Sequence, residues 1–124
     1  MLRSIGTPAA IVLAWAGMGV HDAVELPELI PASPEFLVPT AIYVIAGAAF
    51  LITRTRASAI VLAGWVLLNL VVGGILSVLP LSIFPFVPEQ SVGHYLVHAF
   101  YAVAQVPLLV IAWRAASLRP AQQR

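Results

Sequence analysis

Four long apolar stretches constrain this chain more than any other feature of its sequence. They cover about residues 8–26, 34–53, 57–79 and 91–116. An α-helix needs roughly 20 mostly apolar residues to cross a bilayer, and each stretch provides about that length. The stretches therefore predict an all-α fold class, a polytopic membrane four-helix bundle, with residues 1–124 forming one integral membrane domain.

The segments between the stretches are typical of turns. Three prolines lie between residues 26 and 34, and three more lie between residues 80 and 88. Proline cannot continue a helix, so both segments should be irregular. Ser33, Pro34 and Glu35 form a typical start signal, with a cap, a proline in the first position and an acid in the first turn. Residues 53–56 form a short turn that carries two arginines.

Composition excludes several classes of protein. Hydrophobic residues make up 61% of the chain and charged residues 9%, against about 25% charged in an average soluble domain. A soluble domain of this size could not bury so much apolar surface. A net charge of +1 without any lysine argues against a nucleic-acid partner, and the absence of cysteine excludes disulfides and zinc–thiolate sites. The expected partner is the lipid bilayer.

The charged residues are sorted along the chain in a way that predicts its topology. With a cytoplasmic N-terminus and four spans, all positive residues fall on the inner side: Arg3, Arg54, Arg56, Arg114, Arg119 and Arg124. All acids fall on the outer side: Asp22, Glu25, Glu28, Glu35 and Glu89. Arginines in short loops stay cytoplasmic, so the sequence predicts a multi-pass cell-membrane protein with both termini cytoplasmic, N-in/C-in.

One alternative reduces the number of spans. Arg3, the apolar run after it and the Ala14-Trp15-Ala16 triplet resemble a signal peptide with its cleavage site. Cleavage there would leave three spans. Because the apolar run continues to Val20, we favour a first span.

A polar stripe descends the fourth apolar stretch from its outer end. His94, His98, Tyr101 and Gln105 recur at spacings of three and four, which places them on one helix face. Polar residues in a span usually face the protein interior. We therefore expect this stripe to face the other helices.

The first stretch offers a matching polar cluster at the same outer end. Met18, His21 and Glu25 share a face, and Asp22 is adjacent. First and fourth helices are often neighbours in a bundle, so the two clusters should converge. His21, Asp22, Glu25, His94 and His98 are the candidate metal or ligand residues, with His21, His94 and His98 as metal ligands. Imidazoles suit zinc or copper, and the Met18 thioether would favour Cu⁺.

Two amides lie deeper. Asn69 and Gln105 fall at a similar depth of the third and fourth stretches, which predicts a hydrogen bond between them. Met18, Asn69, Tyr101 and Gln105 are the candidate pocket-lining residues. The alternative is that the amides only hold helices together.

Three kinds of function remain open. The first, which we favour, is a non-enzymatic accessory or metal-binding membrane subunit with a histidine and acid site at the outer face, working with other subunits or as a homo-oligomer. The second is an oligomeric transporter, because the chain resembles the small multidrug-resistance exporters in size and span count. That family uses a glutamate in its first span, and residues 8–20 contain no acid. The third is a small membrane enzyme or a quinone- or lipid-binding protein with a pocket around Asn69, His98 and Gln105.

Overall fold

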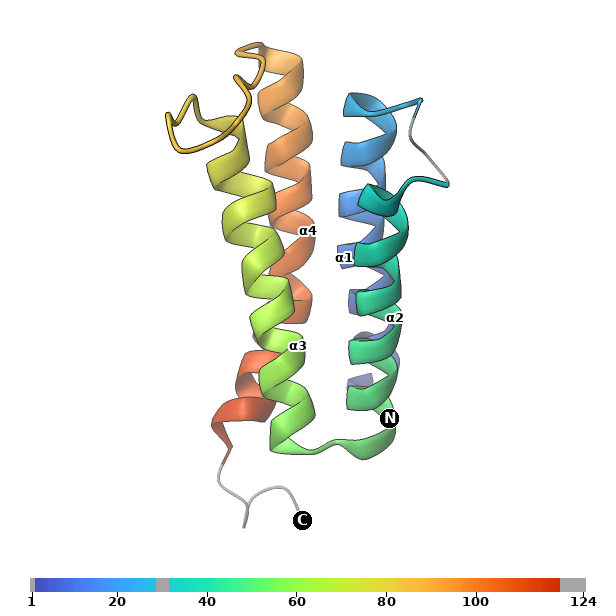
Figure 1. The fold of residues 1–124 in the computed structure, drawn as a ribbon. Coiled ribbons are helices and arrows are strands. Elements are labelled where there is room, and N and C mark those ends of the chain that lie inside the picture. The colour runs from blue at the N-terminus through green and yellow to red at the C-terminus, as the bar shows by residue number, and fades with distance from the viewer. Residues whose placement is uncertain (1, 29–31, 119–124) are drawn as a thin grey trace.

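The protein is all-helical. A computed structural model describes residues 2–28 and 32–118, with the backbone alone for residues 2–5. The helical segments are α1 (Leu2–Glu25), α2 (Pro34–Thr53), α3 (Arg56–Leu68), a π-helical segment η1 (Asn69–Ile75), a short 3₁₀ turn η2 (Leu76–Val78) and α4 (Val92–Ser117). Because α3, η1 and η2 follow one another without a break, four long helices run side by side and alternate in direction (Figure 1).

Helix starts follow the local signals in the sequence. Ser33 is extended before Pro34, while the side chains of Thr55 and Ser91 cap α3 and α4. Each cap oxygen accepts a hydrogen bond from a backbone N–H of the first turn at 3.2 Å, which satisfies a donor that has no partner within the helix. α1 differs from its predicted start at Pro8, because it begins at Leu2 and continues past that proline. Proline removes only one backbone hydrogen bond, and this loss falls near the helix end.

Among the described residues, three helical segments are long and apolar enough to cross a membrane: Pro34–Thr53, Arg56–Val78 and Val92–Ser117. Their outward faces are apolar, as the exposed side chains of Ile45, Ile52 and Val103 illustrate. So much contiguous apolar surface favours association with lipid over water. α1 has the length of a span, but polar residues bracket its apolar run, residues 8–20, so the first predicted span stays a prediction.

α1 and α4 pack closely because small residues face each other between them. A Cβ atom added to Gly17 would lie 2.6 Å from the Cβ atom of Ala104, so the two helices meet with almost no side chain between them. Gly74 plays the same role between η1 and α4, where an added Cβ would lie 2.8 Å from the Cβ of Ala102. Small residues permit such close approach in membrane helices. These contacts fix the ends of α1 and α4 that carry the histidines.

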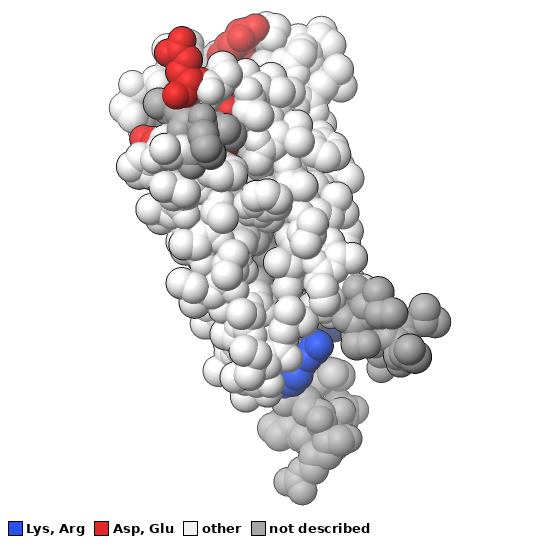
Figure 2. Space-filling model, turned by 90° about the vertical axis from the view of Figure 1, so that its right-hand side faces the viewer, with Lys and Arg blue, Asp and Glu red and all other residues white. Residues whose placement is uncertain are grey.

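The charges separate to opposite ends of the helices (Figure 2). The end formed by the last turn of α1, the start of α2 and the loop before α4 is called the acid end; it holds Asp22, Glu25, Glu28, Glu35 and Glu89. The opposite end is called the arginine end; it holds Arg54, Arg56 and Arg114. The side chains of Arg3, Arg119 and Arg124 lie outside the described residues.

Candidate functional site

A cavity of about 360 Å³ opens at the acid end. Its walls come from the end of α1, from η2, from the loop after it and from the start of α4: His21, Glu25, Leu26, Ser77, Phe86, Pro88, Glu89, His94 and His98. The cavity therefore collects all three histidines of the chain and two of its acids.

One close contact across the cavity joins two histidines from different helices. His21 Nε2 of α1 lies 3.2 Å from His98 Nε2 of α4, and the two rings meet edge to face with their centroids 4.6 Å apart. The structure thus brings together two residues that are 77 positions apart in the sequence. The close approach at Gly17 makes this contact possible, because it holds the backbones of α1 and α4 together one turn away.

Each of these imidazoles has its other ring nitrogen beside a group that only accepts hydrogen bonds. His98 Nδ1 lies 3.0 Å from the carbonyl oxygen of Gly73, and His21 Nδ1 lies 2.9 Å from Asp22 Oδ1. A carbonyl or an ionised carboxylate cannot donate, so we assign a hydrogen to both Nδ1 atoms. In neutral imidazoles both Nε2 atoms then present a lone pair to the same space.

The carbonyl of Gly73 is available because the helix is irregular there. Gly73 belongs to the π-helical segment η1, and its oxygen also accepts a hydrogen bond from Ser77 Oγ at 2.6 Å. A wider helical turn loosens the ordinary hydrogen-bond pattern, and such segments occur often at functional sites. A side chain at this position would collide with Tyr101, since an added Cβ would lie 2.7 Å from its hydroxyl oxygen.

The third histidine, His94, lies beside the His98 ring and also contacts an acid. His94 Nδ1 lies 2.8 Å from Glu25 Oε2, and Glu25, Glu89 and His94 each place one candidate ligand atom within 4.8 Å of the others. The contact of His94 Nδ1 with Glu25 is an ion pair, whereas Nε2 of this buried ring lacks a hydrogen-bond partner among the described residues. A buried polar atom without a partner requires an explanation, and an absent ligand is one.

The predicted set of three imidazole ligands, His21, His94 and His98, stays a prediction, because the three rings line one cavity but are grouped differently there. Among the described residues, the group of three possible metal ligands that lies within 4.8 Å is Glu25, Glu89 and His94, while His21 and His98 form a separate pair. Both groups line one cavity, and the rings of His94 and His98 are 4.5 Å apart. Spacing alone placed His94 and His98 on one face but could not orient their rings.

The four candidate pocket-lining residues lie elsewhere. Met18, Asn69, Tyr101 and Gln105 are buried, yet none of them lines the cavity. Met18 packs in the hydrophobic core. The cavity that His98 lines includes neither Asn69 nor Gln105, and both amides are buried.

The predicted bond between the two amides is wrong. Asn69 accepts a hydrogen bond from the hydroxyl of Tyr101 at 2.5 Å and donates one to the backbone of Trp65 at 2.9 Å. Gln105 accepts from the hydroxyl of Tyr43 at 2.6 Å and donates to the carbonyl of Ala14 at 2.8 Å. Each amide therefore bonds to a tyrosine hydroxyl, a pairing that spacing along the chain did not predict.

We expect the replacement of Tyr43 by phenylalanine to destabilise the helix assembly by about 1–2 kcal/mol. The change leaves the buried carbonyl oxygen of Gln105 without its donor. Unfolding in mixed micelles with increasing dodecyl sulfate measures the effect. Tyr95→Phe is the matched control, because Tyr95 is exposed on α4. Equal stability of the two variants would contradict the assigned hydrogen bond.

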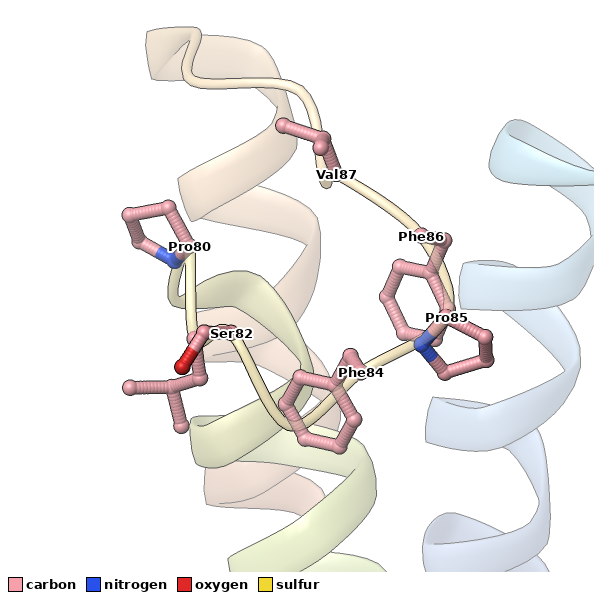
Figure 3. A pocket seen from close by; sticks show the side chains of 7 residues that line it. Pro80, Ser82, Phe84, Pro85, Phe86 and Val87 are labelled. Atoms are coloured by element: carbon pink, nitrogen blue, oxygen red, sulfur yellow. The ribbon is translucent and has the colours of Figure 1, made fainter.

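Glu89, Ser77 and Phe86 were not expected at the site. All three line the cavity, but Glu89 and Phe86 belong to the irregular loop before α4, whose path no periodicity predicts. Figure 3 shows this loop around a second hollow of about 510 Å³, with Phe84 and Phe86 stacked at a centroid distance of 5.2 Å. That hollow has no titratable lining residue, whereas the histidine cavity is lined by three imidazoles and two carboxylates.

Comparison of the chain with protein-family models, with curated proteins and with solved structures gives no match.

Proposed function

We propose that the chain crosses the membrane four times, with both termini in the cytoplasm and the acid end outside. The separation of acids from arginines along the helices supports this topology, because arginines in short loops are retained on the cytoplasmic side. α1 is the least apolar helix, and its buried contacts with α4 hide its polar residues Thr7 and Asp22 from lipid. The packing of α1 against α2 and α4 makes its lower hydropathy tolerable.

Single cysteines test this topology directly, since the natural chain has none. A membrane-impermeant maleimide added to intact cells should label Glu28→Cys and Val87→Cys at the acid end. It should label Gly6→Cys and Ala57→Cys only after the cells are opened. All four positions are exposed, so access depends on the side of the membrane. Labelling of positions 6 and 28 from the same side would show that α1 does not cross.

We further propose that the cavity at the acid end binds a transition metal ion, with His21 Nε2 and His98 Nε2 as two of its ligands. The observation that carries this proposal is that both Nε2 lone pairs face each other at 3.2 Å. Two lone pairs at this distance repel unless a positive group lies between them. For zinc–nitrogen bonds of about 2.0–2.1 Å, tetrahedral coordination places two ligand nitrogens about 3.3 Å apart. The 3.2 Å between the two Nε2 atoms therefore suits such an ion.

The surroundings of the two imidazoles favour the same function. Metal-binding histidines usually donate their other ring N–H to a carboxylate or a backbone carbonyl, which orients the ring and raises its basicity. The Asp22 carboxylate accepts from His21 Nδ1 in this way, and the Gly73 carbonyl accepts from His98 Nδ1. His94, Glu25 and Glu89 border the same cavity as further donors, and no arginine of the described residues lines it.

The donor set favours zinc over monovalent copper. Soft thioether ligands select Cu⁺, whereas imidazole and carboxylate donors suit Zn²⁺. Met18 was the candidate thioether, and it packs in the core away from the cavity lining. The protein is therefore proposed as a non-enzymatic membrane subunit that binds zinc at its outer face.

Zinc titration of the purified, chelator-treated protein in detergent tests this function. We expect one Zn²⁺ ion to bind per chain in competition with a chromophoric chelator, and Cu⁺ to bind more weakly. The competing occupant of the histidine pair is a proton shared by the two Nε2 atoms and neutralised by Asp22. Absence of zinc binding above a detergent blank would favour that proton and contradict the proposed metal site.

A further inference from the structure

A third cavity, of about 720 Å³, lies at the arginine end, opposite the histidine site. Its lining comes from the start of α1, the end of α2 and the end of α4: Gly6, Thr7, Phe50, Arg54, Ile111, Arg114, Ala115, Ser117 and Leu118. It thus combines two arginines with the apolar side chains of Phe50, Ile111 and Leu118.

The backbone and an aromatic ring hold Arg54 at the edge of this cavity. Arg54 follows α2 in the left-handed conformation, with φ at 52°, and its Nε donates to the carbonyl of Leu51 at 3.2 Å. Its guanidinium carbon lies 5.3 Å from the centroid of the Phe50 ring, within the range of a cation–π contact. These contacts occupy one N–H and one face of the guanidinium, which has further donors for a ligand.

Neither lining arginine is paired with an acid in the described part of the chain. The ion pairs found there join histidines to carboxylates at the acid end. Arg114 is exposed on the last turns of α4, so both guanidinium groups meet solvent or lipid at the same end. Two unpaired cations beside apolar side chains are complementary to a ligand that has an anionic head and an apolar tail.

We propose that this cavity binds one anionic phospholipid, with its phosphate at Arg54 and Arg114 and an acyl chain along Phe50, Ile111 and Leu118. Guanidinium groups bind phosphate oxygens through paired, charge-assisted hydrogen bonds. The cavity lies where α2 and α4 end, which is the depth of phosphate groups in a bilayer. Basic pockets between helices on the cytoplasmic side are typical sites for anionic headgroups. This inference rests on the membrane placement proposed above and is independent of zinc.

Native mass spectrometry of the full chain, released from nanodiscs that contain equal amounts of phosphatidylglycerol and phosphatidylcholine, tests the proposal. We expect one phosphatidylglycerol to remain bound per chain in preference to phosphatidylcholine. Arg54→Gln and Arg114→Gln should each reduce that preference about fivefold. Arg56→Gln is the matched control, because Arg56 lies at the same end but donates to the carbonyl of Ala116 and does not line the cavity.

Four results would overturn the proposal. Equal retention of both lipids would show that the cavity has no anionic ligand. An equal loss of preference in Arg56→Gln would show a diffuse effect of surface charge. Displacement by soluble glycerol 3-phosphate would indicate a site for a free anion. Failure of the chain to enter nanodiscs would contradict the membrane placement itself, whereas normal insertion without lipid preference would contradict only the lipid site.

Discussion

Replacement of His98 by alanine is expected to weaken zinc binding by roughly 100-fold or more. The change removes one of the two Nε2 donors that meet at 3.2 Å and leaves His21 without its partner on α4. Because loss of an outer-shell partner alone typically costs 10- to 100-fold in metal affinity, loss of the ligand itself should cost at least as much. Competition with a chromophoric chelator measures the affinity of each variant.

Two further variants show whether the loss of zinc affinity in His98→Ala reflects loss of a ligand or a general change in structure. Asp22→Asn keeps the shape of the carboxylate beside His21 Nδ1 but removes its charge, so we expect a loss of about 10- to 100-fold. Val103→Ala changes an exposed residue of α4 that does not line the cavity and should leave zinc affinity unchanged. Wild-type affinity in His98→Ala, with the protein folded and monodisperse, would remove His98 from the site.

Gly17→Val should have the second large effect, because it separates α1 from α4. The Cβ atom of any residue at position 17 would lie 2.6 Å from the Cβ of Ala104 and 3.5 Å from the carbonyl oxygen of Tyr101. Neither neighbour is the flexible end of a side chain, so the helices must move apart. Overpacking of a close contact typically costs about 1–3 kcal/mol. We expect lower stability in mixed micelles together with weaker zinc binding.

Gly64→Val is the matched control for the loss of stability and zinc affinity expected in Gly17→Val. Gly64 lies on the outward face of α3, and an added Cβ would meet nothing within 4 Å. The same substitution there should leave stability within about 0.5 kcal/mol of the wild type and zinc affinity unchanged. If both glycine variants behaved alike, the close contact of α1 and α4 would not be what positions the histidines.

The length of the apolar stretches and the signals at their ends predicted the helices well. The segments from Pro34 to Thr53 and from Val92 to Ser117 differ from the expected ranges by one residue at most. A cap, a proline or a charged turn ends each of them, and such signals act over a few residues only. The start of α1 was missed because Thr7 and Pro8 resemble a helix start, although the helix begins earlier at Leu2.

The contents of the site were less predictable, because they depend on packing between helices. Spacing placed His94 and His98 on one face, and both are buried at the cavity. It could not show that Gly73 would lie in a π-helical segment whose carbonyl holds His98 Nδ1. Spacing also could not predict that Glu89 of the irregular loop lies near His94. These contacts join positions with no fixed separation along one helix.

X-ray absorption at the zinc edge of the zinc-loaded protein tests most directly whether imidazoles of α1 and α4 share one metal ion. We predict nitrogen and oxygen ligands at about 2.0–2.1 Å, the scattering pattern of at least two imidazoles, and no sulfur shell. The pattern should lose one imidazole in His21→Ala and one in His98→Ala. A spectrum without imidazole scattering, or one that is identical in the wild type and both variants, would contradict a zinc site built from His21 and His98.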